Sequence, residues 1–338
     1  MGDRHSTRVN IVDWYMFLTF DILGDLGFGE SFDCLENSTC HPWVQTIFNY
    51  FKASAFVGTL RMYFTMSVDK MLVRCIPKSV KQASQDHYQW AVDKVHRRMN
   101  LETQRDDFMS HILRHNNENG MTIPEIESNT SVLIVAGSET CGTVLSGTTN
   151  YLIKAHDAYR KLTEEIRSSF SKEEDITFAS LTELPYLNAV IEEGLRLCPP
   201  NASGLSHVVP FRGDTVCGEW LPEGTVVSVH QWSLYRSNMR FHRPNDFLPE
   251  RWLPESRVDP SSPFVNDDLP SVQAFSIGLW SCVGKQLAYG QLRVVLARMV
   301  WNFDICVAMG GRNVDWTKQK CWFVMQKEPF DVELVNVR

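Results

Sequence analysis

The chain has 338 residues, of which 43% are hydrophobic and 22% are charged, so it can bury a large core and does not read as disordered. Its formal net charge is −7 and its few basic clusters are short, which argues against nucleic-acid binding. The nine cysteines are odd in number and scattered, without a Cys-x-x-Cys pair. That pattern favours a reducing compartment over a disulfide framework or a zinc site.

The N-terminal part of the chain is predicted to be mostly helical. The opening MGDRHSTRVN is polar and unlike a signal peptide. Apolar residues then recur at helical spacing in the segments 11–26, 42–60, 79–101 and 106–115. We interpret 43–66 as an amphipathic helical pair, because polar residues interrupt it, and we predict no transmembrane segment.

A long central helix is predicted from about Thr122 to Tyr151, roughly 30 residues and ~45 Å. Thr122 and Glu125 have the form of a capping box, with a proline in the first turn. The helix contains glycines, each of which costs about 1 kcal/mol relative to alanine. We therefore expect something to pack against its backbone.

Further helices are predicted at about 156–170 and 183–197, and the second ends before two prolines. Residues 207–230 alternate and carry turn signals, which indicates two or three strands. A proline-rich meander covers 243–270, and the tail has the pattern of a strand pair. The expected fold class is mainly α with a small β-rich part (α+β). We expect a single domain over 1–338, with a helical body (1–200), strands and meander (201–270), a cysteine loop with its helix (271–305) and C-terminal strands (306–338).

The most informative motif is FSIGLWSCVG, residues 275–284. Cys282 stands just before a predicted helix, where the positive end of the helix dipole favours thiolate over thiol. Gly278 and Gly284 allow a tight turn and the close approach of a flat ligand. The motif suits an iron or an electrophile, and a buried structural cysteine is the alternative from this stretch alone.

A second motif, AGSET (136–140), lies in the middle of the long helix. Gly137 opens space beside the helix, the Thr140 hydroxyl can hydrogen-bond whatever fills that space, and Glu139 can relay protons. The alternative is a glycine packing groove with a threonine that bonds back to its own helix.

Charged residues form a third pattern. Glu193 and Arg196 are three apart on a predicted helix with apolar flanks, which suggests partial burial, although such pairs are common on surfaces. Pro249-Glu250-Arg251-Trp252 follows further along the chain.

Together and in this order, these patterns resemble the cytochrome P450 family. Phe275, Gly278, Cys282 and Gly284 match its ligand loop, Phe-x-x-Gly-x-Arg-x-Cys-x-Gly. AGSET is similar to its oxygen-activation segment, and Glu-x-x-Arg followed by Pro-Glu-Arg-aromatic is similar to its structural triad. The resemblance covers essentially the whole chain and is greatest to microsomal-type fungal members, often enzymes of secondary metabolism.

The resemblance implies a haem-thiolate monooxygenase that acts on a hydrophobic small molecule. Haem b would be bound through iron by Cys282, with Ala136 and Gly137 forming a groove over it, while Thr140 and Glu139 assist proton delivery. Glu193, Arg196 and Arg251 would brace the ligand loop from behind. Electrons would come from an NADPH-dependent flavoprotein reductase, dioxygen would be the co-substrate, and the protein would be a monomer. The pocket would be lined by 133–140, 201–205 and 325–329.

The sequence departs from the family pattern at two positions and at its start. Trp280 replaces an arginine that usually binds a haem propionate, and His207 falls where relatives often have another. The resemblance also implies that the chain begins partway into the family's helical domain. By the same resemblance, full-length relatives are expected to be anchored in the endoplasmic-reticulum membrane, and this chain, for which we predict no transmembrane segment, to be cytoplasmic or peripherally membrane-associated. The alternative function is a non-catalytic fragment, or an incomplete gene model, that does not hold haem.

Overall fold

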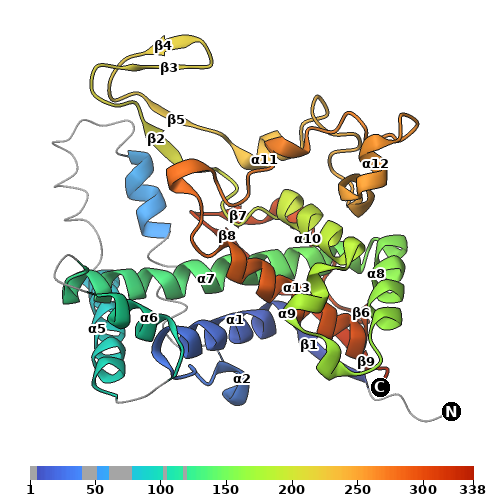
Figure 1. Ribbon diagram of the computed structural model, residues 1–338, viewed down its shortest axis with the longest axis horizontal. Coiled ribbons are helices and arrows are strands. Elements are labelled where there is room, and N and C mark those ends of the chain that lie inside the picture. The colour runs from blue at the N-terminus through green and yellow to red at the C-terminus, as the bar shows by residue number, and fades with distance from the viewer. Residues whose placement is uncertain (1–5, 40–51, 61–77, 102–104, 117–119) are drawn as a thin grey trace. The chain divides into compact units, whose positions relative to one another are not determined.

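The structure is a computed structural model, and it describes residues 6–39, 52–60, 78–101, 105–116 and 120–338 (Figure 1). These residues form two compact units. We call them the α1 unit, from the described parts of 5–146 and 306–334, and the α13 unit, 147–305 and 335–338.

The α1 unit is mainly helical. Its elements are β1 (Ser6–Asn10), α1 (Ile11–Phe28), α2 (Cys34–Asn37), a helical stretch at 52–60, α5 (Lys78–Asn100), α6 (Phe108–His115), most of α7 (Ile123–Leu152), η5 (Trp316–Lys318), β7 (Lys320–Cys321), β8 (Met325–Gln326) and most of β9 (Asp331–Asn336). β7 pairs antiparallel with β8, so the strand pair expected in the tail is present. Much of the helical pair expected over 43–66 lies outside the described residues.

Local sequence explains where the main helices of this unit begin. The Asn10 side chain accepts a hydrogen bond from the Val12 amide at 3.3 Å and caps α1. In the first turn of α7, the Glu125 carboxylate accepts a hydrogen bond from the Thr122 amide at 2.7 Å, as the capping box predicts. Aromatic residues then fill the core, where Phe32 stacks on Trp90 with ring centroids 5.1 Å apart.

The α13 unit contains the end of α7 and a longer list of short elements. They are α8 (His156–Ser169), η1 (Glu173–Asp175), α9 (Phe178–Thr182), α10 (Pro185–Leu197), β2 (Ser206–Val208), β3 (Asp214–Val216), β4 (Glu219–Leu221), β5 (Val226–Ser228), α11 (Gln231–Tyr235), η2 (Pro249–Trp252), α12 (Pro254–Val258), η3 (Leu269–Ser271), η4 (Gly278–Trp280), α13 (Lys285–Asn302) and most of β6 (Phe303–Val307). β2 pairs with β5 and β3 with β4, and Figure 1 shows the β3–β4 hairpin at the end of the β2–β5 ribbon.

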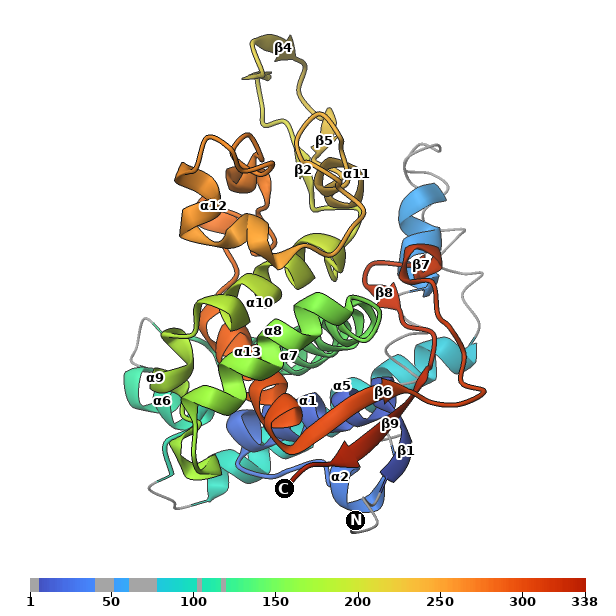
Figure 2. The same cartoon turned by 90° about the vertical axis from the view of Figure 1, so that its right-hand side faces the viewer.

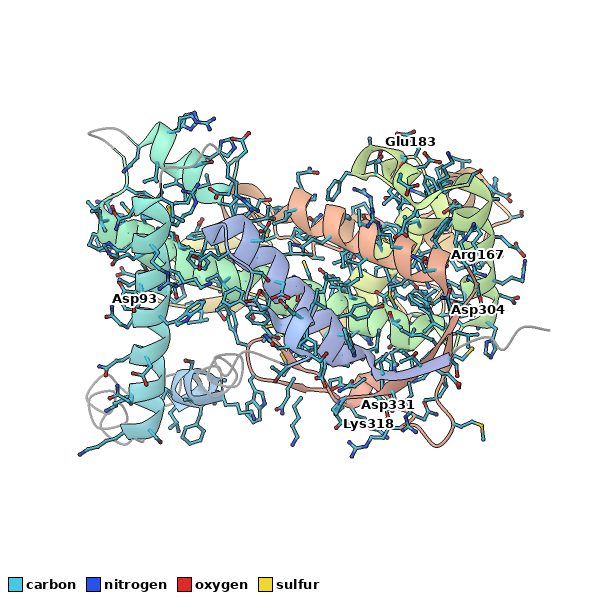
Figure 3. All side chains as sticks on the ribbon, turned by 90° about the horizontal axis from the view of Figure 1, so that it is seen from below. Asp93, Arg167, Glu183, Asp304, Lys318 and Asp331 are labelled. Carbon is cyan, nitrogen blue, oxygen red and sulfur yellow. The ribbon has the colours of Figure 1, made fainter. Side chains whose placement is uncertain are left out.

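Helix α10 lies at the centre of the α13 unit. It packs against η2, α8 and α13, and Figure 2 shows α8 and α13 beside it. Arg167 of α8 fixes the end of α13, because its guanidinium donates to the carbonyls of Val300 and Phe303 and pairs with the Asp304 carboxylate at 2.8 Å (Figure 3). The mainly α fold class with a small β-rich part is thus confirmed by the element order. Within the described ranges, no helix is both long and apolar enough to span a bilayer.

Candidate functional site

The structure brings Glu193, Arg196 and Arg251 together in a buried network of the α13 unit. All three side chains are fully buried. Arg196 grips the Glu193 carboxylate with two nitrogens, Nε to Oε2 and Nη2 to Oε1, each at 2.8 Å. Arg251 Nε donates to Oε1 at 3.1 Å. The forked arrangement is the strong geometry for an arginine–carboxylate pair.

Residues that sequence reasoning missed complete this network. The Trp252 indole donates to Glu193 Oε2 at 2.9 Å, and the Asp267 carboxylate pairs with Arg251 Nη1. Trp252 lies within the recognised Pro-Glu-Arg-aromatic motif, which could have indicated it. Asp267 stands in the meander without a motif, so no sequence signal points to it.

Tyr235 connects the network to the cysteine loop. Its carbonyl accepts from Arg196 Nη1 at 2.6 Å, and its hydroxyl accepts from the Gln273 amide at 2.9 Å. Gln273 precedes Phe275, the first residue of the loop motif, by two positions. The network therefore contacts the chain just before the loop through one buried tyrosine, whose pKa burial raises to about 12.

The protonation state of Glu193 follows from its partners. Complete burial works to raise the pKa of this carboxyl, but the charges and hydrogen bonds of Arg196 and Arg251 outweigh it and hold the pKa below its usual value. Glu193 is consequently an anion and, together with the Asp267 carboxylate, balances the charges of the two arginines.

The cysteine loop is a tight turn directly before α13. The Cys282 amide donates to the Phe275 carbonyl at 2.8 Å and closes the loop, and Gly284 is the residue before the helix. Gly278 has φ +64° and Ser276 has φ +59°, the left-handed region that glycine adopts easily and serine does not. The buried structural cysteine considered above is not what the structure contains, because Cys282 is exposed and free.

The AGSET segment lies in the α1 unit, and its residues divide between two faces of α7. Thr140 is partly exposed, and its hydroxyl donates to the carbonyl of the exposed Ala136 at 2.6 Å. The space expected beside Gly137 is filled instead, since a Cβ at Gly137 would lie 2.9 Å from Leu23 of α1. The glycine thus serves helix–helix packing, which was the alternative interpretation.

Glu139 points into the interior of the α1 unit. Its side chain has no exposed area, and Oε2 pairs with Nζ of Lys327 at 2.7 Å. Oε1 is buried and has no hydrogen-bond partner in the part of the chain that the structure describes. The Lys327 side chain is 2% exposed and also donates to the Thr143 hydroxyl at 3.3 Å. The acid of this motif is therefore held in an ion pair from the C-terminal turn, a contact that the helix sequence does not indicate.

Comparison with known proteins identifies the family that carries these features. The family model described as "Cytochrome P450" matches residues 1–334. The chain belongs to the cytochrome P450 family. Its fold agrees, because the P450 structure titled "Crystal structure of cytochrome P450DA heme domain" superposes with a TM-score of 0.77 at 18% identity, covering 98% of this chain and 69% of that one.

Fungal P450 sequences are much more similar. The "Cytochrome P450 monooxygenase astJ" of Aspergillus oryzae is 45% identical over 97% of this chain and 64% of its own length. The "Trichothecene C-4 hydroxylase" of Trichoderma arundinaceum is 41% identical over 94% of this chain and 64% of its own length. The chain thus spans about 64% of the length of these P450 relatives.

P450 proteins hold a haem through a thiolate, and the surroundings of Cys282 fit such a group. Apolar side chains beside the cysteine are strongly exposed: Leu279 is 100%, Val283 90% and Trp280 68% exposed. An exposed thiol among exposed apolar side chains offers a soft ligand and a surface for a flat apolar macrocycle. His207 lies beside Trp280 in the same unit, with ring centroids 6.0 Å apart.

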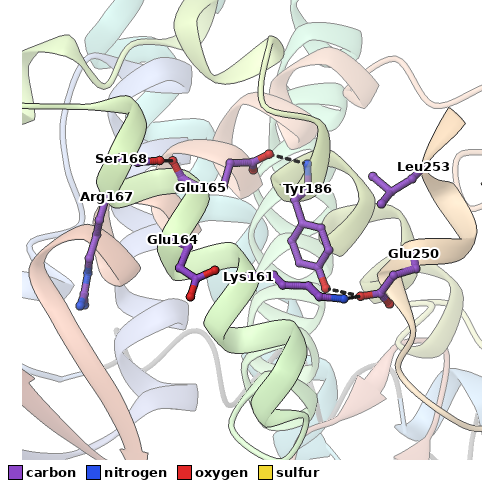
Figure 4. A pocket seen from close by; sticks show the side chains of 8 residues that line it. All are labelled: Lys161, Glu164, Glu165, Arg167, Ser168, Tyr186, Glu250 and Leu253. Atoms are coloured by element: carbon purple, nitrogen blue, oxygen red, sulfur yellow. Dashed lines mark hydrogen bonds and ion pairs between the residues drawn. The ribbon is translucent and has the colours of Figure 1, made fainter. Parts of the chain in front are cut away.

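A separate hollow on the α13 unit has a different character. It measures about 760 Å³ and is lined mainly by polar side chains. The Tyr186 hydroxyl and the Lys161 ammonium both contact Glu250 Oε1, at 2.8 and 2.7 Å (Figure 4). Glu165 accepts from the Tyr186 amide at 2.8 Å and so caps α10. These polar groups bind one another, and the cysteine loop, all of which the structure describes, contributes no residue to the lining of the hollow.

Proposed function

We propose that this chain is a haem-thiolate monooxygenase that inserts one oxygen atom into a hydrophobic small molecule of fungal secondary metabolism. The observation that carries the proposal is Cys282, exposed at the end of a closed loop before α13 and surrounded by exposed apolar side chains. The printed names of the relatives, monooxygenase and hydroxylase, support the same reaction class.

Haem b is the proposed cofactor and Cys282 its iron ligand. When bound, the haem supplies the activation of dioxygen, and the thiolate favours O–O cleavage. The closed loop fixes the backbone of the cysteine, because the Cys282 amide donates to the Phe275 carbonyl. Gly278 and Gly284 have no side chains that would obstruct a ligand at Cys282. Trp280 and His207 are proposed to lie toward the propionates, in place of arginines.

Thr140 and Glu139 are proposed to handle protons. The Thr140 hydroxyl donates a hydrogen bond to the Ala136 carbonyl, so its oxygen lone pairs can accept a hydrogen bond from a donor on the exposed side of α7. Glu139 lies in the interior, where Oε1 has no hydrogen-bond partner among the described residues and Lys327 fixes Oε2. The proposed partners are dioxygen, an NADPH-dependent flavoprotein reductase and the hydrophobic substrate, with the protein as a monomer.

The deciding experiment is a reduced, CO-bound difference spectrum of the purified full chain after haem supplementation. We expect a thiolate-type Soret band, its loss in Cys282→Ser, and its retention in Cys217→Ser. Cys217 is the matched control, because it is also an exposed free cysteine of the α13 unit. Absence of the band from the wild-type chain contradicts the proposed function.

Trp280 gives a second test of the same site. Because Trp280 is 68% exposed, Trp280→Arg removes no core packing and introduces a forked, charged donor for a carboxylate. We expect higher haem occupancy at equal haem concentration, measured from the ratio of Soret to protein absorbance. If the haem occupancy of Trp280→Arg is equal to or lower than that of the wild type, Trp280 does not weaken haem binding.

A further inference from the structure

Helix α13 presents a stripe of polar side chains to α10, beginning three residues after Cys282. Lys285, Tyr289 and Arg293 are four residues apart and share one face of α13. The Tyr289 hydroxyl donates to Glu192 Oε1 at 2.6 Å, and Arg293 Nε donates to Asn188 Oδ1 at 2.8 Å. Asn188 and Glu192 are likewise four apart on α10. Two facing stripes thus join the helices turn by turn.

The aromatic ring of the cysteine loop rests on this stripe. Phe275 contacts the Tyr289 ring with centroids 5.1 Å apart, and the Lys285 ammonium lies 5.9 Å from the Phe275 centroid. The Phe275 carbonyl accepts the Cys282 amide at 2.8 Å. A continuous set of contacts therefore leads from Glu192 through Tyr289 and Phe275 to Cys282.

The Glu192 carboxylate accepts a hydrogen bond from the Tyr289 hydroxyl. Burial raises the pKa of its carboxyl, while the Tyr289 hydrogen bond and the charges of Lys285 and Arg293 work in the opposite direction. Tyr289 is the group bonded to it directly, and the guanidinium of Arg293 lies 5.2 Å from the Tyr289 ring centroid. Removing the hydroxyl takes a donor from a largely buried carboxylate, which loosens the ring on which Phe275 rests.

We propose that Tyr289 and Glu192 are positioning residues that hold Phe275, and through it the Cys282 loop, in the arrangement that ligates the haem iron. This inference rests on the proposed function, in which Cys282 is the iron ligand. The loop needs such support for two reasons. The backbone of Ser276 lies in the left-handed region, and the apolar side chains of the loop are exposed. This support is distinct from the Glu193 network, which reaches the chain at Gln273 through Tyr235.

The test compares Tyr289→Phe with Tyr186→Phe in the full chain. Each substitution deletes one hydroxyl that donates to a glutamate in the α13 unit, Glu192 in one case and Glu250 in the other. The Tyr186 pair lies at the polar hollow and has no contact with Phe275 among those described (Figure 4). The readout is the CO-bound spectrum of the haem-supplemented protein, in which a thiolate-type band is distinguished from the blue-shifted band of a lost thiolate.

We expect Tyr289→Phe to lower the ratio of thiolate-type to blue-shifted band about tenfold, the effect of one hydrogen bond to a charged group on an equilibrium. Tyr186→Phe should keep the wild-type ratio of the two bands, even if its thermal unfolding midpoint falls as much as that of Tyr289→Phe. Glu192→Gln retains an oxygen acceptor and should keep more of the ratio than Glu192→Ala. Equal ratios in Tyr289→Phe and Tyr186→Phe overturn this inference, whereas a wild-type chain without a thiolate-type band overturns the proposed function and this inference with it.

Discussion

Glu193→Gln should destabilise the protein strongly, because Glu193 is the central anion of the buried network. The carboxylate accepts five hydrogen bonds, from two nitrogens of Arg196, from Arg251, from the Leu248 amide and from the Trp252 indole. Glutamine keeps the shape but removes the charge and turns one acceptor into a donor that faces other donors. Breaking a buried pair in this way costs roughly 3–5 kcal/mol.

The measurement is urea unfolding followed by tryptophan fluorescence, extrapolated linearly to water. Glu164→Gln is the matched control, because Glu164 also pairs with an arginine, Arg160, at 2.9 Å, but with side chains 62% and 56% exposed. An exposed pair of this kind contributes less than about 1 kcal/mol. If Glu193→Gln lowers the unfolding free energy no more than Glu164→Gln does, the network is not the internal brace inferred here.

The same variant predicts a pH dependence. The pKa of Glu193 is lowered in the folded protein from its ordinary value of 4.5. The stabilisation is therefore fully present above that value and is lost as the pH falls below it toward the folded-state pKa. The difference in unfolding free energy between wild type and Glu193→Gln should shrink in acid. A difference that is constant from neutral pH into acid contradicts the assignment of Glu193 as the anion.

Two further substitutions test contacts elsewhere in the chain. Lys327→Met leaves the buried Glu139 carboxylate without its cation and should cost roughly 3–5 kcal/mol in urea unfolding, whereas Lys318→Met, in a pair whose lysine is 81% exposed, should cost less than about 1 kcal/mol. Gly194→Ala places a Cβ 2.1 Å from the Thr148 hydroxyl and should lower the unfolding free energy by about 1–3 kcal/mol. The double variant Gly194→Ala/Thr148→Ala should recover most of that loss, since the Thr148 hydroxyl is then absent. Equal losses for the two lysines, or strictly additive losses for the glycine pair, contradict these contacts.

The buried network shows how far a sequence can predict a site. Glu193 and Arg196 are three apart on one helix with apolar flanks, so their pairing and partial burial follow from helix geometry alone. The approach of Arg251 does not, and it was expected only through the family resemblance. Tyr235, the last residue of α11, and Asp267, in the irregular meander, are not predicted, because each meets its arginine across a separation in the chain that has no period from which contacts can be read.

The AGSET helix shows a different limit. Successive residues of an α-helix point about 100° apart, so a motif of five residues cannot face one ligand. Thr140 and Ala136, four apart, share the exposed side, whereas Gly137 packs on Leu23 and Glu139 turns inward. The sequence alone left the packing groove and the functional groove as alternatives, since only the neighbouring helix decides what fills the space beside a glycine.

Helix α10 carries two adjacent carboxylates, Glu192 and Glu193, which helix geometry directs to different faces. Glu193 faces the arginine network, which reaches the chain before the cysteine loop at Gln273, while Glu192 faces α13 and supports the loop at Phe275. Each carboxylate has only one helix face available, so neither can substitute for the other. It follows that loss of the Glu193 network should chiefly lower the stability of the fold, whereas loss of the Glu192 contact should chiefly alter how Cys282 is presented.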